Sequence, residues 1–208
     1  MKNTYGILLF LWACICAGCG TSGRQQPDTS KDIVLAYVTS NGKTLPDPSL
    51  VTHINYAFGH VDSTFSKVVI DRESRLQEIA NLKKDAPHLK VLLSIGGWGS
   101  GRFSEMAADE QCRLSFARDC RRVVDQFGLD GIDIDWEYPT SRAAGISASD
   151  ADTENYTLLM RDIREAIGSG KLLTLASAAN AKYIDFKAID PYICLLYTSD
   201  AADDTPCV

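Results

Sequence analysis

The chain has 208 residues, of which 23% are charged and 45% are hydrophobic, and its formal net charge is −6. This composition is typical of a globular protein. The acidic balance argues against nucleic acid as a partner, because phosphate binding calls for a basic surface.

The first 19 residues are typical of an export signal. Lys2 supplies a positive start, and Tyr5 to Ile15 form an apolar run too short to span a bilayer as a helix. The following Cys16-Ala17-Gly18-Cys19 resembles a bacterial lipobox, although Cys16 departs from the usual aliphatic residue. Cys19 would then be lipidated, which predicts a membrane-anchored lipoprotein in the periplasm or at the cell surface. The alternative is an ordinary secretory signal, which also predicts export.

A polar segment and scattered cysteines come next. Residues 20–31 are predicted to be a linker because they are rich in Gly, Ser, Gln and Pro. Export permits disulfides, but Cys112 and Cys120 lie eight residues apart on one predicted helix. A helix separates them by roughly 12 Å, too far for a bond. We therefore expect buried free cysteines.

Apolar, β-rich runs alternate with segments of helical spacing. In chain order we predict strands at 33–39 and 54–58, a helix at 72–84, a strand at 89–95, a helix at 104–127, a strand at 129–136, a helix at 153–167 and a strand at 172–178. Residues 186–193 lead into a sixth strand.

This alternation predicts an α/β fold with parallel strands. A doubly wound sheet and a (β/α)8 TIM barrel both fit the pattern. The doubly wound dinucleotide fold would need G-x-G-x-x-G after the first strand, and residues 38–42 lack it. A complete barrel needs about 250 residues. The barrel hypothesis therefore treats residues 32–193 as the N-terminal strands and helices of an incomplete barrel.

The C-terminal segment does not continue the preceding pattern. Cys194-Leu-Leu-Tyr-Thr-Ser-Asp-Ala-Ala-Asp203 resembles the translated read-through of a transposon adapter used to prepare sequencing libraries. We therefore expect residues 194–208 to be non-native and the natural protein to be longer. The alternative is a genuine divergent tail.

Three acidic residues alternate with apolar ones on the fourth predicted strand. Because side chains alternate across a strand, Asp133, Asp135 and Glu137 should share one face, which points into the interior of a barrel. Three carboxylates cannot all stay ionised cheaply there, so at least one pKa should rise. Glu137 comes last, at the C-terminal mouth where barrel active sites form. A protonated acid at that place is what cleavage of a glycosidic bond needs.

Two other interpretations of these acids fit less well. A solvated acidic edge strand would not ordinarily alternate with Ile132, Ile134 and Trp136. A calcium loop needs a glycine midway and a glutamate at its twelfth position, and the segment has neither. The three histidines show no ligand spacing, so we predict no metal and no cofactor.

The motifs resemble those of one enzyme family. Asp130-x-x-Asp133-x-Asp135-x-Glu137 resembles the signature of glycoside hydrolase family 18, and Trp136-Glu137-Tyr138-Pro139 looks like its chitinase branch. Ser94-Ile95-Gly96-Gly97-Trp98 resembles the motif at the end of the family's third strand. Tyr56-Ala57-Phe58 and Tyr37 resemble its second-strand motif and first-strand aromatic residue. The likeness runs from about residue 33 to residue 193.

The resemblance implies roles for the acids. Glu137 would act as general acid and then as base, Asp135 would hold the acetamido group of the substrate, and Asp133 would share a proton with Asp135. Retention would be substrate-assisted through an oxazolinium ion, since this family is an exception to the two-carboxylate scheme. Asp130 has the opposite parity along the strand, so we expect a structural role for it.

The other motif residues divide into supporting and substrate-binding candidates. Ser94, Gly96 and Gly97 are expected to support the barrel mouth rather than contact substrate. The candidates for substrate binding, each with core or rim packing as the alternative, are Tyr37, Phe58, Trp98 and Tyr138. The family's sixth-strand Met-x-Tyr-Asp motif is absent, and Tyr197 is not carried over because its surroundings lack that pattern.

The leading hypothesis is an exported chitinase acting on chitin or other oligosaccharides that contain N-acetylglucosamine. An endo-β-N-acetylglucosaminidase acting on N-glycans would use the same acids, and Trp136 with Tyr138-Pro139 favours the chitinase. A sugar-binding lectin typically replaces the acid, which is present here. We expect the 208-residue fragment itself to be inactive.

Overall fold

The computed structural model describes residues 32–179 and 182–198. The chain divides into two units, residues 1–32 and 33–208, and only the second contains an extended described segment. The predicted signal, linker and lipidation site at Cys19 lie outside the described residues. Within the described part, no helix has the length and apolar character needed to cross a membrane.

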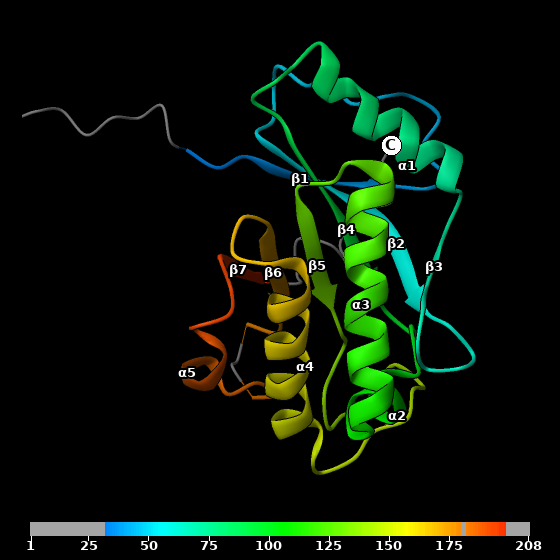
Figure 1. The fold of residues 1–208 in the computed structure, drawn as a ribbon, viewed down its shortest axis with the longest axis vertical. Coiled ribbons are helices and arrows are strands. Elements are labelled where there is room, and N and C mark those ends of the chain that lie inside the picture. Colours follow the sequence, from blue (N-terminus) through cyan, green and yellow to red (C-terminus); the bar gives the residue numbers. More distant parts are fainter. Residues whose placement is uncertain (1–31, 180–181, 199–208) are drawn as a thin grey trace, which may run out of the picture. The chain divides into compact units, whose positions relative to one another are not determined.

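The second unit is built on a curled sheet (Figure 1). Neighbouring strands of its main path are parallel and follow chain order, as in the first part of a barrel. These strands are β1 (Leu35–Thr39), β2 (His53–Val61), β4 (Lys90–Gly96), β5 (Gly131–Asp135), β6 (Leu172–Ser177) and β7 (Leu195–Thr198). The short β3 (Val68–Ile70) pairs antiparallel with the end of β2. Within the described residues, β1 and β7 are therefore the edges of the sheet.

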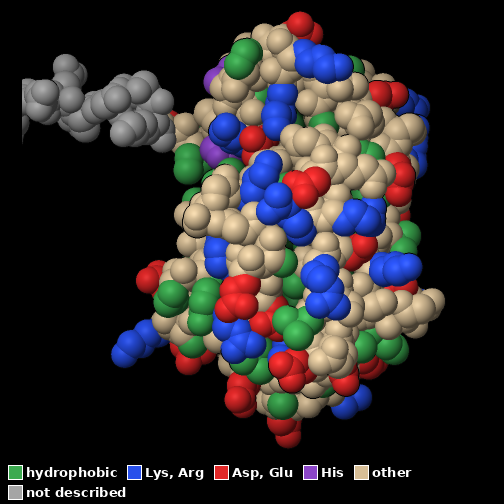
Figure 2. All heavy atoms as spheres, in the orientation of Figure 1, with side chains coloured by type: hydrophobic (Ala, Val, Ile, Leu, Met, Phe, Trp, Pro, Cys, Tyr) green, Lys and Arg blue, Asp and Glu red, His purple; other side chains and the backbone are tan. Residues whose placement is uncertain are grey.

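Helices cover one face of this sheet. They are α1 (Glu73–Asn81), a 3-10 turn η2 (Leu82–Lys84), α2 (Phe103–Ala108), α3 (Glu110–Phe127), α4 (Asp152–Ile167) and α5 (Phe186–Ile189). The two long helices, α3 and α4, lie side by side against the central strands (Figure 1). Their outward surface carries interspersed basic and acidic side chains, as expected of a solvated helix face (Figure 2).

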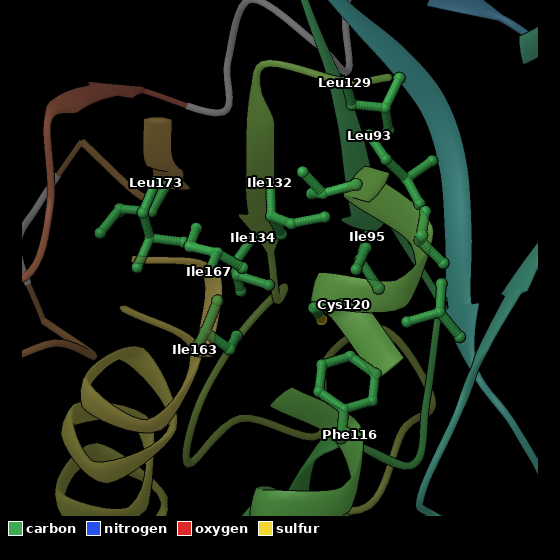
Figure 3. Packing of buried hydrophobic residues seen from close by; sticks show 14 of the residues in the cluster. Leu93, Ile95, Phe116, Cys120, Leu129, Ile132, Ile134, Ile163, Ile167 and Leu173 are labelled. Atoms are coloured by element: carbon green, nitrogen blue, oxygen red, sulfur yellow. The ribbon is translucent and has the colours of Figure 1, made fainter. Parts of the chain in front are cut away.

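The hydrophobic core lies between the sheet and these helices (Figure 3). Ile132 and Ile134 of β5 are fully buried there, together with Cys120 of α3 and Ile163 of α4. Burying one such aliphatic side chain contributes about 1.5–3 kcal/mol. Because this packing fixes which face of β5 meets the helices, it also fixes which residues point to the opposite face.

The predicted helix at 104–127 is interrupted. Asp109 has an extended backbone (φ −101°, ψ 123°) and separates α2 from α3. Its carboxylate accepts a hydrogen bond from the Cys112 backbone N–H at 2.8 Å, which caps the start of α3. Cys112 and Cys120 are free as expected, although only Cys120 is fully buried and Cys112 is half-buried.

The prediction for residues 186–193 is wrong in detail. Phe186–Ile189 forms the short helix α5, because the Asp185 side chain accepts from the Ala188 N–H and caps it. The next strand is β7 at Leu195–Thr198, which pairs in parallel with β6. β7 lies inside the segment that we attribute to read-through, and the origin of that segment stays a prediction. β3 was not predicted from the sequence.

Candidate active site

The three acids of β5 and its end are buried on the sheet face opposite the helices. Asp133 and Asp135 are 0% exposed and Glu137 is 1% exposed, whereas the intervening Ile134 and Trp136 belong to the hydrophobic core. The predicted alternation of acidic and apolar faces is therefore present. The acids occupy the concave side of the curled sheet, where the interior of a barrel forms.

Asp133 accepts hydrogen bonds from four hydroxyl groups on four different strands. Ser94 Oγ of β4 donates to Oδ2 at 2.7 Å, and Tyr37 Oη of β1 donates to the same oxygen at 2.9 Å. Thr174 Oγ1 of β6 donates to Oδ1 at 2.6 Å, and the Tyr197 hydroxyl of β7 donates to it as well. Strand register explains the cluster, since Ser94, Asp133 and Thr174 lie opposite one another across β4, β5 and β6.

Burial and hydrogen bonding act in opposite directions on this carboxyl group. Burial raises the pKa of Asp133, and the hydrogen bonds from Thr174, Tyr197, Ser94 and Tyr37 favour the charged form and limit the rise. The expectation that at least one acid has a raised pKa is thus met at Asp133. Burial, followed by the charge of Asp133, also raises the pKa of Tyr37 and Tyr197, so both phenols remain protonated donors.

Gly96 and Gly97 allow β4 to approach β5 beside Asp135. Gly96 has φ +133°, and a Cβ atom there would lie 1.9 Å from the Asp135 carbonyl oxygen. The Gly97 N–H donates to that same oxygen at 2.9 Å. A Cβ atom on Gly97 would lie 2.9 Å from the Phe58 ring. These glycines, like Ser94, therefore contact the protein's own backbone and acids, in keeping with a supporting role.

Aromatic side chains border the mouth of the site. Trp98 is 57% exposed, and its ring meets Tyr138 edge-on with centroids 6.4 Å apart. Tyr138 in turn stacks on Tyr183 at 5.0 Å with nearly parallel planes. Trp98 also lines an open cavity of about 470 Å³ together with Phe58 and residues 96–102. An exposed aromatic face beside a cavity can stack on the C–H groups of a sugar ring.

The predicted site residues fall into separate places. Phe58, Trp98 and Tyr138 lie at the mouth, whereas Tyr37 lies deeper and bonds to Asp133. Asp130 belongs to neither group. It precedes β5, and its carboxylate pairs with Lys83 Nζ at 2.6 Å and accepts from the Val91 N–H at 2.9 Å, which are structural contacts.

Sequence reasoning missed several residues of the cluster. Thr174 had a usable signal, since it is a polar residue within the apolar run of the neighbouring predicted strand. Asn55 is fully buried and donates through Nδ2 to the Tyr197 hydroxyl at 2.5 Å, but only the register of β2 reveals it. Tyr197 was set aside with the tail. In the described ranges, no three His, Cys, Asp or Glu side chains are grouped so that they could hold a metal ion.

Comparison with known proteins identifies related sequences. The family model "Glycosyl hydrolases family 18" matches residues 33–200. "Probable chitinase 2" of Drosophila melanogaster is 35% identical, over 84% of this chain and 39% of its own length. "Chitinase A1" of Niallia circulans is 31% identical, over 84% of this chain and 26% of its own length.

Solved structures agree with these relatives. The chitinase domain of the spore coat protein CotE from Clostridium difficile has a TM-score of 0.78 and 35% identity, covering 85% of this chain and 51% of that one. A family 18 N-acetylglucosaminidase from Paenibacillus barengoltzii has a TM-score of 0.73 and 36% identity, with 79% and 52% covered. The predicted fold class, a partial (β/α)8 barrel, is thereby confirmed. The chain spans about half or less of the length of these proteins.

Proposed function

Since the chain belongs to glycosyl hydrolase family 18, we propose that the complete protein hydrolyses β-1,4 bonds of chitin or chito-oligosaccharides and retains the anomeric configuration. One observation carries this proposal. Glu137 is buried just after the C-terminal end of β5, on the chain segment that also places Asp133 and Asp135 on the concave face. Barrel enzymes carry out their chemistry at that end of their strands.

In the proposed mechanism, Glu137 donates a proton to the leaving glycosidic oxygen. The acetamido oxygen of the substrate attacks the anomeric carbon and forms an oxazolinium ion, while Asp135 orients and polarises that acetamido group. Water then opens the ion, with Glu137 acting as base. Asp133 supports Asp135 by exchanging a proton with it. The hydroxyl donors Tyr37, Ser94 and Thr174, which precede residue 194, favour the charged form of Asp133 against the cost of burial.

Substrate binding is proposed at the aromatic mouth. Trp98 offers an exposed ring, and Tyr138 and Tyr183 extend the same aromatic wall. Aromatic faces suit N-acetylglucosamine polymers because these carry no charge but present apolar C–H faces. A lectin would need such a wall without the acid, and the presence of Glu137 together with both aspartates argues for catalysis.

The proposal is tested on the full-length gene product with chitohexaose. We expect proton NMR to detect the β-anomer as the first product, whereas an initial α-anomer would contradict retention. Glycan binding without any turnover would instead identify a lectin.

Glu137→Gln should lower kcat by about two orders of magnitude or more, because the amide cannot donate the proton. Glutamine is nearly the same size as glutamate, so the variant should fold like the wild type. Circular dichroism and the melting temperature check this. Turnover near that of the wild type in this variant would count decisively against the assignment.

A further inference from the structure

Two helices hold the chain on both sides of Glu137. Trp136, which precedes it, is 1% exposed and stacks on Phe103 of α2 with centroids 5.3 Å apart and planes 14° apart. The same indole lies 5.8 Å from the ring of Tyr156 of α4. The side chain of the residue before Glu137 is thus packed against side chains of both α2 and α4.

The chain after Glu137 is held by a single carboxylate. Asp152, the first residue of α4, is 0% exposed. Its Oδ2 accepts from the Thr140 N–H at 3.2 Å and from the Ser149 N–H at 2.8 Å, and its Oδ1 accepts from Ser104 Oγ of α2 at 2.7 Å. Asp152 therefore joins both ends of the loop between Pro139 and α4 to the same two helices.

Thr140 has an unusual backbone conformation, and its hydrogen bond to Asp152 helps to fix that conformation. Thr140 has φ +62°, a left-handed conformation that a β-branched residue rarely adopts. Such a conformation persists only where the surroundings fix it, and its N–H bond to Asp152 supplies one fixed contact. Thr140 lies three residues after Glu137, on the same loop segment that leaves the acid.

We propose that Asp152, assisted by Ser104, is a positioning residue that sets the location of the Glu137 carboxyl group for proton donation. This inference rests on the proposed function. Asp152 acts through the loop and not by touching substrate, since its carboxylate bonds to Ser104, Thr140 and Ser149. General acid catalysis requires the acid within hydrogen-bond reach of the leaving oxygen, and a shift of about 1 Å can lower a rate about 100-fold.

Leaving-group dependence separates positioning of the acid from a general loss of structure. Cleavage of chitotetraose releases a poor leaving group and needs the proton from Glu137. Cleavage of the 2,4-dinitrophenyl glycoside of chitobiose releases a weakly basic phenolate that leaves without protonation. We therefore compare kcat/KM for the two substrates in the full-length gene product, because this quantity reports the bond-breaking step.

Asp152→Ala should lower kcat/KM for chitotetraose by about 10- to 100-fold. It should lower the value for the dinitrophenyl glycoside by less than about threefold, since that substrate needs no acid. Asp152→Asn should recover most of the loss, because its amide oxygen can accept both N–H bonds and the Ser104 hydroxyl can turn to accept. Ser104→Ala removes one bond and should give a smaller loss with the same substrate dependence.

Asp162→Asn is the matched control on the same helix. Asp162 is buried and pairs with Arg113 Nε of α3 at 2.9 Å, away from the loop that Asp152 holds. This variant should lower the melting temperature but affect both substrates by the same factor.

Equal losses on both substrates in Asp152→Ala, or no loss, would overturn the inference. If that variant does not fold, equal losses in Ser104→Ala overturn it instead. A wild-type protein inactive on both substrates would remove the proposed function and the inference with it. Glu137→Gln is the positive control for acid catalysis. It must lower kcat/KM much more for chitotetraose than for the dinitrophenyl glycoside.

Discussion

At the scale of single residues, the carboxyl group of Asp133 is held by hydroxyl groups from several strands. It is fully buried, yet its two oxygens together accept four hydrogen bonds from hydroxyl groups. Hydroxyl groups can rotate, so they can support the charged form and can also accommodate a neutral carboxylic acid. The surroundings of Asp133 therefore suit a group that gains and loses a proton during a reaction.

The substitution Tyr37→Phe tests how the Tyr37 hydroxyl supports the charged form of Asp133, with the free energy of unfolding as the measure. The folded-state pKa of Asp133 is raised above 3.8, so its contribution to stability is fully present at low pH and is lost as pH rises through that raised pKa. Removing the Tyr37 hydroxyl removes a bond that favours the charge, which raises the pKa further. We expect the variant to be less stable than the wild type by about 1–3 kcal/mol at neutral pH. The difference should shrink as the pH falls towards 3.8.

Chemical denaturation of the full-length gene product between pH 4 and pH 8 measures this difference. Tyr56→Phe is the control, because the Tyr56 hydroxyl bonds to the backbone oxygens of Asp71 and Arg72 and not to a carboxylate. The change in unfolding free energy caused by Tyr56→Phe should therefore not vary with pH as Asp133 titrates. A Tyr37→Phe difference that is constant across the pH range would contradict the role given to this hydroxyl.

At the scale of elements, the longer strands and helices could be predicted from the sequence, whereas the shortest ones could not. The strand β5 and the helix α4 follow from period-2 and period-3.6 spacing, and the acidic face of β5 follows from the same alternation. The strand β3 has three residues and the helix α5 has four, which is too short for a period to be recognised. The break at Asp109 depends on one capping bond.

The site was predictable where it is local in sequence. Asp133, Asp135 and Glu137 lie on one strand, so their common face could be deduced from spacing. Asn55 joins the cluster only through pairing of β2 with its neighbours, and Asp152 joins the acid loop only through folded contacts with Thr140 and with Ser104 of α2. Such contacts between distant segments have no signature in a single sequence.

Gly96→Ala tests the close approach of β4 and β5. The added Cβ would lie 1.9 Å from the Asp135 backbone oxygen, and φ +133° is strained for any other residue. We expect a loss of more than about 3 kcal/mol in unfolding free energy, since both a clash and backbone strain must be relieved. Thermal and chemical unfolding measure this loss.

Gly128→Ala provides the comparison for Gly96. Gly128 also has positive φ, at +64°, but no heavy atom lies within 4 Å of its added Cβ. This substitution should therefore show the conformational cost alone, about 1 kcal/mol. Equal losses at the two positions would mean that the strand approach at Gly96 is unimportant.

At the scale of the whole molecule, the described strands do not close into a barrel. Among the described strands, β1 and β7 are edges with a partner on one side only. Unpaired edges promote association with other chains. We expect the 208-residue polypeptide, expressed alone, to aggregate or remain partly unfolded, as judged by size-exclusion chromatography and denaturation. A soluble monomer that unfolds cooperatively would refute this expectation.

Membrane attachment is a second prediction at this scale. We propose that Cys19 is lipidated after export, because small residues precede it and a short apolar run begins the chain. In a bacterial host, the wild type should incorporate a labelled fatty acid and partition with membranes. Cys19→Ser should abolish both, and Cys16→Ser should leave both intact. Labelling that persists in Cys19→Ser would contradict the assignment.

The contrast between two indole rings offers a direct optical readout of the site. Trp98 is 57% exposed at the mouth, whereas Trp136 is 1% exposed in the core. Iodide should therefore quench the fluorescence of Trp98 and leave that of Trp136 almost untouched. A saccharide resting on Trp98 would shield it from the quencher, so occupancy could be followed without labelling the ligand.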